Sequence, residues 1–156
     1  MPHKTRRLLI GGAVIMSLSV AASAQPLTIV NPPNLGDPTP NGYSTAVVMP
    51  ANARLAFISG QGGHDHTGAL SPDFATQVEQ AYANLSAALD GIGAKPDQVA
   101  KLTIFVVDHD MSKLGVLTQN VSSMFGDRLP AQTLVPVPKL AVDAMLFEVE
   151  AVVVLD

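Results

Sequence analysis

VAKLTIFVVD, residues 99–108, is apolar or β-branched at nearly every central position. A nearly continuous apolar run of this length predicts a strand that is buried on both faces in the middle of a sheet. Two further strands are predicted after it. Residues 146–155 contain FEVEAVVVL, a long run without a breaker. Residues 133–137 predict a short strand at an edge, because Pro136 interrupts the strand and Pro138 follows it.

A helix is predicted before this central strand. It begins at Ser71-Pro72-Asp73, which offers a capping hydroxyl, a proline for the first turn and an acid near the positive helix end. It ends at Gly91 and Gly93, and Pro96 prevents its continuation. Its apolar stripe, at spacings of three and four, consists of Phe74, Val78, Tyr82, Leu85, Leu89 and Ile92.

A second helix is predicted after the central strand, and a hairpin before the first helix. The hairpin joins STAVVMP, residues 44–50, to LAFISG, residues 55–60, through the turn-like residues 51–53. The resulting order predicts an α+β fold in which two helices cover one face of a mixed β-sheet. The apolar content of 47% favours burial of the other face between subunits. The second helix covers residues 111–125, with Asp108 or Asp110 as its cap and Leu114, Leu117, Val121 and Met124 as its stripe.

The N-terminus has the pattern of an export signal. Three basic residues precede the apolar run of residues 8–22, and Ala22-Ser23-Ala24 fits a signal peptidase site. We therefore expect residues 1–24 to be a signal peptide cleaved after Ala24, which makes the protein periplasmic or secreted. The run is too short to span a bilayer comfortably, so we expect no membrane partner after cleavage. General and twin-arginine export both remain open.

The mature chain is predicted to hold an extended lead-in, residues 25–42, and one domain, residues 43–156. Cleavage removes three positive charges and leaves 6 lysines and arginines against 13 aspartates and glutamates, a net charge of −7. This acidic balance argues against a nucleic-acid partner. The sequence contains no cysteine, which excludes disulfides, thiolate catalysis and cysteine-ligated metals.

Short motifs follow one another along the mature chain in an order that resembles the RidA/YjgF family of imine and enamine deaminases. The resemblance covers about residues 30–155, nearly the whole mature chain, and defines residues 43–156 as a RidA-like domain. The motifs are PNGYSTAV at 40–47, FISGQ at 57–61, Thr67-Gly68, the helix with Gln80, Ala81, Asn84 and Leu85, KLTIFVVD at 101–108, PAQTLV at 130–135 and FEVEAVVV at 147–154.

The resemblance implies a chorismate-mutase-like fold that assembles as a homotrimer with three clefts between neighbouring subunits. It also implies hydrolysis of small imines or enamines to carbonyl compounds and ammonia, with no cofactor and no metal. A glutamate on the last strand of the family, here Glu148, helps to position the attacking water. A tyrosine and a serine line the cleft, here Tyr43 and Ser59. The family's asparagine falls at residues 118–120, with Asn120 as the candidate.

The arginine with which family members grip a substrate carboxylate is absent, because Gln132 follows Pro130-Ala131. A guanidinium gives a carboxylate two charge-assisted hydrogen bonds, whereas glutamine offers an uncharged amide. Affinity for a 2-imino acid should fall by about 10-fold or more. Arg128 and Lys139 are the nearest cations in the sequence, and each is more simply explained as a solvated surface charge.

Strand alternation turns Glu148 and Glu150 to one side of the last strand and its apolar residues to the other. A carboxylate on that side suits a cleft between subunits as well as an ordinary solvent-facing edge. His64 and His66 are separated by one residue and could share a metal on a strand. The glycines around them predict a turn instead, so we assign no metal site.

The sequence therefore favours a RidA-like homotrimer that hydrolyses small reactive imines or enamines, with Glu148 positioning water and Gln132 bonded to a small-molecule substrate. The alternative is a non-catalytic binder of small molecules on the same trimer. A holdase with exposed apolar surface is a third possibility, for which no specific motif speaks.

Overall fold

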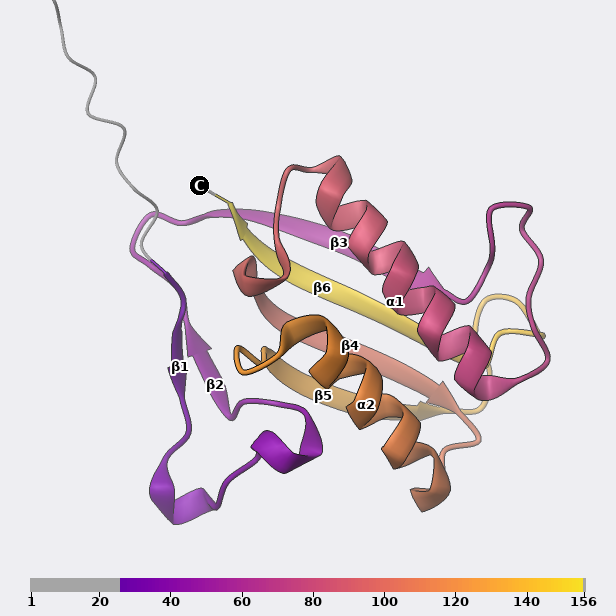
Figure 1. The fold of residues 1–156 in the computed structure, drawn as a ribbon, viewed down its shortest axis with the longest axis horizontal. Coiled ribbons are helices and arrows are strands. Elements are labelled where there is room, and N and C mark those ends of the chain that lie inside the picture. The colour runs from indigo at the N-terminus through magenta and orange to yellow at the C-terminus, as the bar shows by residue number, and fades with distance from the viewer. Residues whose placement is uncertain (1–25, 156) are drawn as a thin grey trace, which may run out of the picture.

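The computed structural model describes residues 26–155, so the predicted signal peptide, residues 1–24, lies outside the described part. Its main sheet has four strands in the order β3-β6-β4-β5, in which β4 and β5 are parallel and the other neighbours antiparallel (Figure 1). The predicted central strand, β4, indeed lies inside the sheet. The strands are β3 (Arg54–Gly62), β4 (Val99–Val107), β5 (Ala131–Val137) and β6 (Phe147–Leu155).

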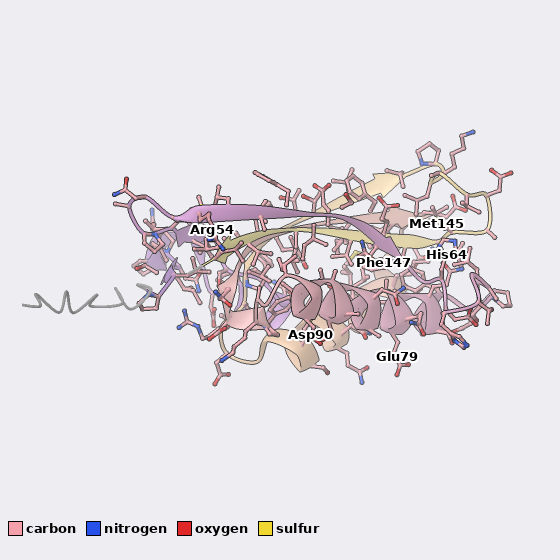
Figure 2. All side chains as sticks on the ribbon, turned by 90° about the horizontal axis from the view of Figure 1, so that it is seen from above. Arg54, His64, Glu79, Asp90, Met145 and Phe147 are labelled. Atoms are coloured by element: carbon pink, nitrogen blue, oxygen red, sulfur yellow. The ribbon has the colours of Figure 1, made fainter. Side chains whose placement is uncertain are left out.

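Two helices cover one face of this sheet and leave the other face without a helix (Figures 1 and 2). They are α1 (Phe74–Gly91) and α2 (Leu114–Phe125), and a short 3-10 turn, η4 (Met111–Lys113), leads into α2. Asp110 accepts a bond from the backbone N–H of Ser112 and so caps η4, which settles the choice between Asp108 and Asp110. The predicted α+β fold, a mixed sheet with two helices on one face, is confirmed.

The start of α1 differs from the prediction. The helix begins at Phe74, and its cap is Asp73, whose Oδ2 accepts a 2.8 Å bond from the backbone N–H of Thr76. The hydroxyl of Ser71 accepts from the N–H of Asp73 instead, before the helix begins. At the other end Ile92 lies beyond the helix and is 42% exposed, because the chain turns there, so the buried stripe ends at Leu89.

The predicted hairpin is wrong. The turn is present, with Asn52 in the left-handed region at φ 62, but the segments on its two sides do not pair. The first, β2 (Ala46–Val48), pairs antiparallel with β1 (Thr28–Val30), a strand within the predicted lead-in. The second, β3, pairs with β6, which offers an unbroken strand of nine residues. The long-range partner therefore prevails over the local one.

The core lies between the helices and the covered face of the sheet. Phe147 is fully buried at its centre, where its ring stacks on Tyr82 at 5.9 Å and meets Phe74 edge-on at 6.4 Å. Gln77 of α1 is also fully buried and ties three segments together. Its amide donates to the carbonyls of Ser71 and Ala144, and its Oε1 accepts from the N–H of Leu146.

The other face of the sheet, which we call the open face, carries both charged and apolar side chains. Glu148 and Glu150 of β6 lie on it, because Phe147, Val149 and Ala151 are buried on the covered face, as predicted. Phe57 of β3 is 76% exposed. Within residues 26–155, the helices are all too short or too polar to cross a membrane.

Candidate functional site

The segment that carries Tyr43 is fixed against the edge of β5. Ser44 forms a parallel bridge with Ala131, and its backbone N–H donates to the carbonyl of Pro130 at 2.9 Å. Its hydroxyl donates to the carbonyl of Leu129 at 2.7 Å, and the residue is only 2% exposed. These bonds place Tyr43 beside Gln132, the residue that stands where the family pattern has arginine.

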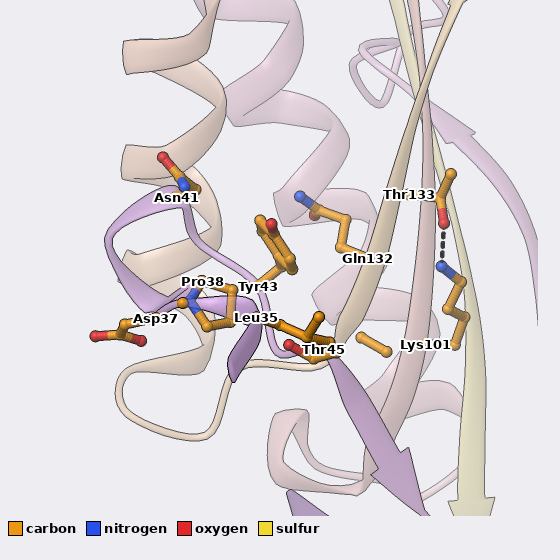
Figure 3. A pocket seen from close by; sticks show the side chains of 11 residues that line it. Leu35, Asp37, Pro38, Asn41, Tyr43, Thr45, Lys101, Gln132 and Thr133 are labelled. Atoms are coloured by element: carbon orange, nitrogen blue, oxygen red, sulfur yellow. Dashed lines mark hydrogen bonds between the residues drawn. The ribbon is translucent and has the colours of Figure 1, made fainter. Parts of the chain in front are cut away.

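Two adjoining pockets, each of about 400 Å³, share Asn41, Tyr43, Gln132 and Thr133 as lining residues. Figure 3 shows the Tyr43 ring and the Gln132 side chain close together on the same side of β5. The first, which we call the edge pocket, is completed by Leu35, Gly36, Asp37, Pro38, Thr45, Lys101 and Ala131. The second, which we call the apolar pocket, is completed by Ile104, Leu114, Leu117, Thr118 and Leu134.

Gln132 has an unusual environment for an amide. It is opposite Leu102 of β4, so its side chain extends toward the covered face of the sheet, where α2 packs. Its Oε1 is buried and has no hydrogen-bond partner within the described chain. A buried acceptor without a donor is costly in a folded protein, and such groups often mark the place of a ligand or water. A hydrogen bond from a bound molecule would therefore be most favourable at Gln132.

Three other residues singled out from the sequence lie away from these pockets. Asn120 donates to the carbonyl of Val116 along the helix, whereas Thr118 on the same helix lines the apolar pocket. Arg128 donates to the carbonyl of Leu27 at 3.1 Å. Lys139 is exposed in the loop that follows β5. Neither cation lines the edge pocket or the apolar pocket, so neither takes the place of the absent arginine.

Glu148 lies on the open face, beside the Ser59-Gly60-Gln61 segment. A Cβ atom at Gly60 would lie 2.0 Å from Oε1 of Glu148 and 2.4 Å from its Cδ, so the carboxylate occupies the space that a side chain would need. The pairing of β3 with β6 is irregular between Ile58 and Gln61, which places Gly60 in a bulge. The Glu148 carboxylate can therefore lie in this position only because residue 60 is a glycine.

Lys101 was missed as a site residue because it sits within the apolar run of the central strand. It lines the edge pocket and a smaller pocket of about 220 Å³ on the open face, which also includes Ser59, Thr103 and Glu150. Its ammonium donates to the hydroxyl of Thr133. Burial lowers the pKa of Lys101, and the nearby Glu150 carboxylate opposes this shift. The sequence did contain one signal for this residue, because a single lysine within a run predicted to be buried is unusual.

The turn that contains His64 and His66 is organised by hydrogen bonds. The Asp65 carboxylate accepts from the hydroxyl and N–H of Thr67 and from the N–H of Ala69, which lowers the pKa of Asp65. Asn84 of α1 donates to the carbonyls of Gly62 and His64 and so holds the turn against the helix. Residues 26–155 contain no group of three histidine, aspartate or glutamate side chains placed to hold a metal ion.

Comparison with known proteins identifies the family. The model of the family described as Endoribonuclease L-PSP matches residues 37–155. A RutC family protein of Aquifex aeolicus is 37% identical over 121 residues, which cover 75% of this chain and 92% of that protein. The chain belongs to the RidA/YjgF family. A 2-iminobutanoate/2-iminopropanoate deaminase of Salmonella typhimurium is 29% identical over 102 residues, 64% of this chain and 79% of the relative.

Solved structures of the RidA/YjgF family have the same fold. The Rid family protein YyfB of Yersinia pestis superimposes with a TM-score of 0.80 at 29% identity, covering 84% of this chain and all of that protein. RidA of an Antarctic Psychrobacter gives a TM-score of 0.60 at 29% identity, over 72% of this chain and 88% of RidA.

In this RidA/YjgF chain the motif residues fall into two groups. Tyr43 and Gln132 line shared pockets on the covered side of β5, and Ser59 and Glu148 lie on the open face. Strand β4 separates β5 from β6, so a single chain does not bring Gln132 and Glu148 together. Asn84, another motif residue, has a structural role instead, because it donates hydrogen bonds to the turn.

Proposed function

We propose that this protein hydrolyses small reactive imines and enamines to carbonyl compounds and ammonia. The observation that carries the proposal is the meeting of Tyr43 with Gln132, whose buried Oε1 lacks a donor, in pockets large enough for a small molecule. Membership of the RidA/YjgF family and the similarity to a protein named as an iminobutanoate and iminopropanoate deaminase support it.

The proposed reaction adds water across the C=N bond. The water oxygen forms a bond to the imine carbon, and the π electron pair moves to nitrogen, which takes up a proton from water to give a carbinolamine. Loss of the hydroxyl proton forms the C=O bond, and the C–N bond breaks as nitrogen, protonated a second time, leaves as ammonia. Enamines enter after protonation at carbon and loss of a proton from nitrogen give the imine. Gln132 would hydrogen-bond the substrate, and the Glu148 carboxylate would accept a hydrogen bond from the attacking water and receive its proton. This chemistry requires no cofactor.

A site that contains both groups would be shared between two copies of the chain. Gln132 and Glu148 lie on opposite sides of the sheet in one chain, with β4 between their strands. The homotrimer that the family resemblance implies, with clefts between neighbours, would bring Glu148 of one copy toward the β5 edge of another. The exposed Phe57 on the open face supports burial of that face in such an assembly.

The test measures the decay of an imine produced in the assay by an amino-acid oxidase. Semicarbazide traps the imine that has not been hydrolysed, so an active protein lowers the rate of semicarbazone formation. We expect the native protein to lower this rate and Glu148→Gln to abolish the effect. Glu150→Gln is the matched control, two residues along the same face of β6, and should keep it. Equal activity of Glu148→Gln and the native protein contradicts the role of Glu148.

A non-catalytic binder is the second candidate, favoured by the departure at Gln132 and by the distance between Gln132 and Glu148 in the chain's topology. Such a protein would bind a small molecule in the pockets beside Tyr43 without lowering semicarbazone formation for any imine. We also propose export, from the sequence pattern of residues 1–24. Mass spectrometry of the protein from its native host should then find Gln25 as the first residue.

A further inference from the structure

The apolar pocket has an unusual lining for a site that would receive a carboxylate. Its floor consists of four aliphatic side chains, and its polar groups are all uncharged. No charged residue is among the lining side chains that the structure describes. The aliphatic residues are Ile104, Leu114, Leu117 and Leu134, and the polar ones are Asn41, Tyr43, Thr118, Gln132 and Thr133.

A carboxylate would lose water in this pocket without gaining a cation. Transfer of an ionised group into an apolar environment is strongly unfavourable unless a charged partner or several donors replace its hydration. The described cations are elsewhere: Arg128 is bonded to Leu27, and Lys139 lies in an exposed loop. Lys101 lines the edge pocket, where Asp37 contributes a negative charge, and the small pocket on the open face, but not the apolar pocket. As one chain forms it, the pocket therefore selects against anions.

Gln132 supplies what a neutral nitrogen compound needs. Its Oε1 is a buried acceptor without a donor, and its NH₂ group is a donor on the same amide. A half-turn of the amide exchanges the positions of the oxygen and the NH₂ group, so Gln132 can present either an acceptor or a donor to the pocket. After that half-turn the oxygen would accept from the N–H of an imine or amide, and the aliphatic side chains would bury an apolar substituent.

We propose that the apolar pocket binds uncharged nitrogen compounds with a short apolar substituent, and that the substrates are neutral imines without a carboxylate. The ligand class follows from three observations on one pocket: the orphan Oε1 of Gln132, the aliphatic floor and the absence of a lining charge. The substrate class rests in addition on the proposed hydrolase function. The volume of about 400 Å³ lies in the lower part of the range of ligand pockets, which suits a small molecule.

The first experiment tests the ligand class by binding alone, with a matched pair of stable probes. Isobutyramide and isobutyrate have the same branched apolar group, and only the second is charged. We expect isobutyramide to bind the native protein at least about 10-fold more tightly, by calorimetry or ligand-observed NMR. Gln132→Arg should reverse the order, because a guanidinium pairs with the carboxylate in two hydrogen bonds. Gln132→Leu should lose isobutyramide binding.

Controls separate a lost site from a lost fold. Lys139→Ala changes an exposed loop residue and should bind both probes as the native protein does. Thermal unfolding of each Gln132 variant shows whether it is folded. Tighter binding of isobutyrate than of isobutyramide by the native protein would overturn the proposal. So would the failure of isobutyramide to bind, or equal binding of isobutyramide by folded Gln132→Leu.

The second experiment tests the substrate class and distinguishes it from the hydrolase function. An amine oxidase, with oxygen, converts isobutylamine to its neutral imine and hydrogen peroxide, and an amino-acid oxidase converts valine to the related 2-imino acid. We expect the native protein to accelerate hydrolysis of both imines. The acceleration factor for the neutral imine should exceed that for the 2-imino acid at least about 10-fold. If only hydrolysis of the 2-imino acid is accelerated, the protein is a hydrolase, but the proposal that its substrates are neutral imines is overturned. If neither imine is affected but isobutyramide binds preferentially, the hydrolase fails and the ligand class stands.

Discussion

Position 60 carries no side chain because the carboxylate of Glu148 occupies the space beside it. The atoms that a Cβ would meet are the far end of a flexible side chain, which can rotate away. Position 63 differs, since a Cβ there would meet the backbone of Gln77, at 2.6 Å from its Cα and 2.7 Å from its carbonyl oxygen. The two glycines therefore serve different ends, one the placement of a carboxylate and the other the packing of α1.

Gly60→Ala should displace the Glu148 carboxylate while leaving the fold intact. We expect a loss of unfolding free energy below about 1 kcal/mol and, if Glu148 is catalytic, a loss of imine hydrolysis comparable to that in Glu148→Gln. Gly63→Ala should instead cost about 3 kcal/mol, because backbone would have to move. Urea unfolding and the semicarbazone assay give the two readings. Full activity of Gly60→Ala beside an inactive Glu148→Gln would show that the carboxylate's position is unimportant.

The hydroxyl of Tyr82 is buried without a hydrogen-bond partner in the described chain, and burial raises the pKa of Tyr82. Tyr82→Phe should raise the unfolding free energy by about 1 kcal/mol at about pH 7, because it removes an unsatisfied group. Ionisation in the unfolded chain alone should make the native protein less stable as the pH rises above about 10. The Phe variant should lack this part of the loss. Urea unfolding at about pH 7 and about pH 10.5 measures both effects.

At the residue scale the structure brings together some of the side chains that the sequence singled out and separates others. The pairing of Tyr43 with the Gln132 position followed from the family motifs, and the structure brings these two residues together. The contact of Gly60 with Glu148 depends on a bulge between β3 and β6, whose register no local pattern reveals. Lys101 was hidden because a strand with one lysine still has the composition of a buried strand.

At the scale of elements, Gln77 holds α1 to the segment that precedes β6 through two hydrogen bonds, to Ala144 and Leu146, and a third bond joins it to Ser71 before the helix. Gln77→Ala should lower the unfolding free energy by roughly 3 kcal/mol, since each bond contributes about 1 kcal/mol and the partners remain buried. Glu79→Ala is the control, because Glu79 points away from the sheet on the same helix (Figure 2) and should change stability by less than about 0.5 kcal/mol. Equal values for the two variants in urea unfolding would contradict the role of Gln77.

The elements that the sequence predicted correctly are those with a strong local pattern. Strands β4 and β6 and helix α2 follow from apolar runs and helical spacing within one segment. The pairing of β2 was wrong because a turn signal at Asn52 does not show whether the flanking strands meet. Strand β1 has three residues among prolines and glycines, too few for a periodic pattern.

At the scale of the whole molecule, the open face is expected to contact other copies. Phe57 is 76% exposed there, and Phe57→Asp should convert the expected trimer into a monomer by placing a charge in the contact. Met111 is 79% exposed in η4, which leads into α2 on the helix-covered side, so Met111→Asp should leave the assembly unchanged. Size-exclusion chromatography with light scattering measures the mass. An unchanged mass for Phe57→Asp would place the contact elsewhere.

The assembly could not be read from the residues alone, because an apolar patch does not specify its partner. The expectation of three subunits comes from the family resemblance, whereas the exposed Phe57 shows only that a large apolar side chain remains uncovered in one chain. Export is likewise a proposal from the sequence, since it depends on residues 1–24, which lie outside the described chain.

The bridge from Ser44 to Ala131 closes part of a sheet edge as well as positioning Tyr43. Unpaired strand edges recruit other chains, and along β5 the segment around Ser44 protects one end while Pro136, which has no N–H, protects the other. Detachment of this segment would open the edge and dismantle the pockets at the same time. A molecule bound against Tyr43 and Gln132 should therefore slow aggregation of the protein, so that occupancy and colloidal stability rise together.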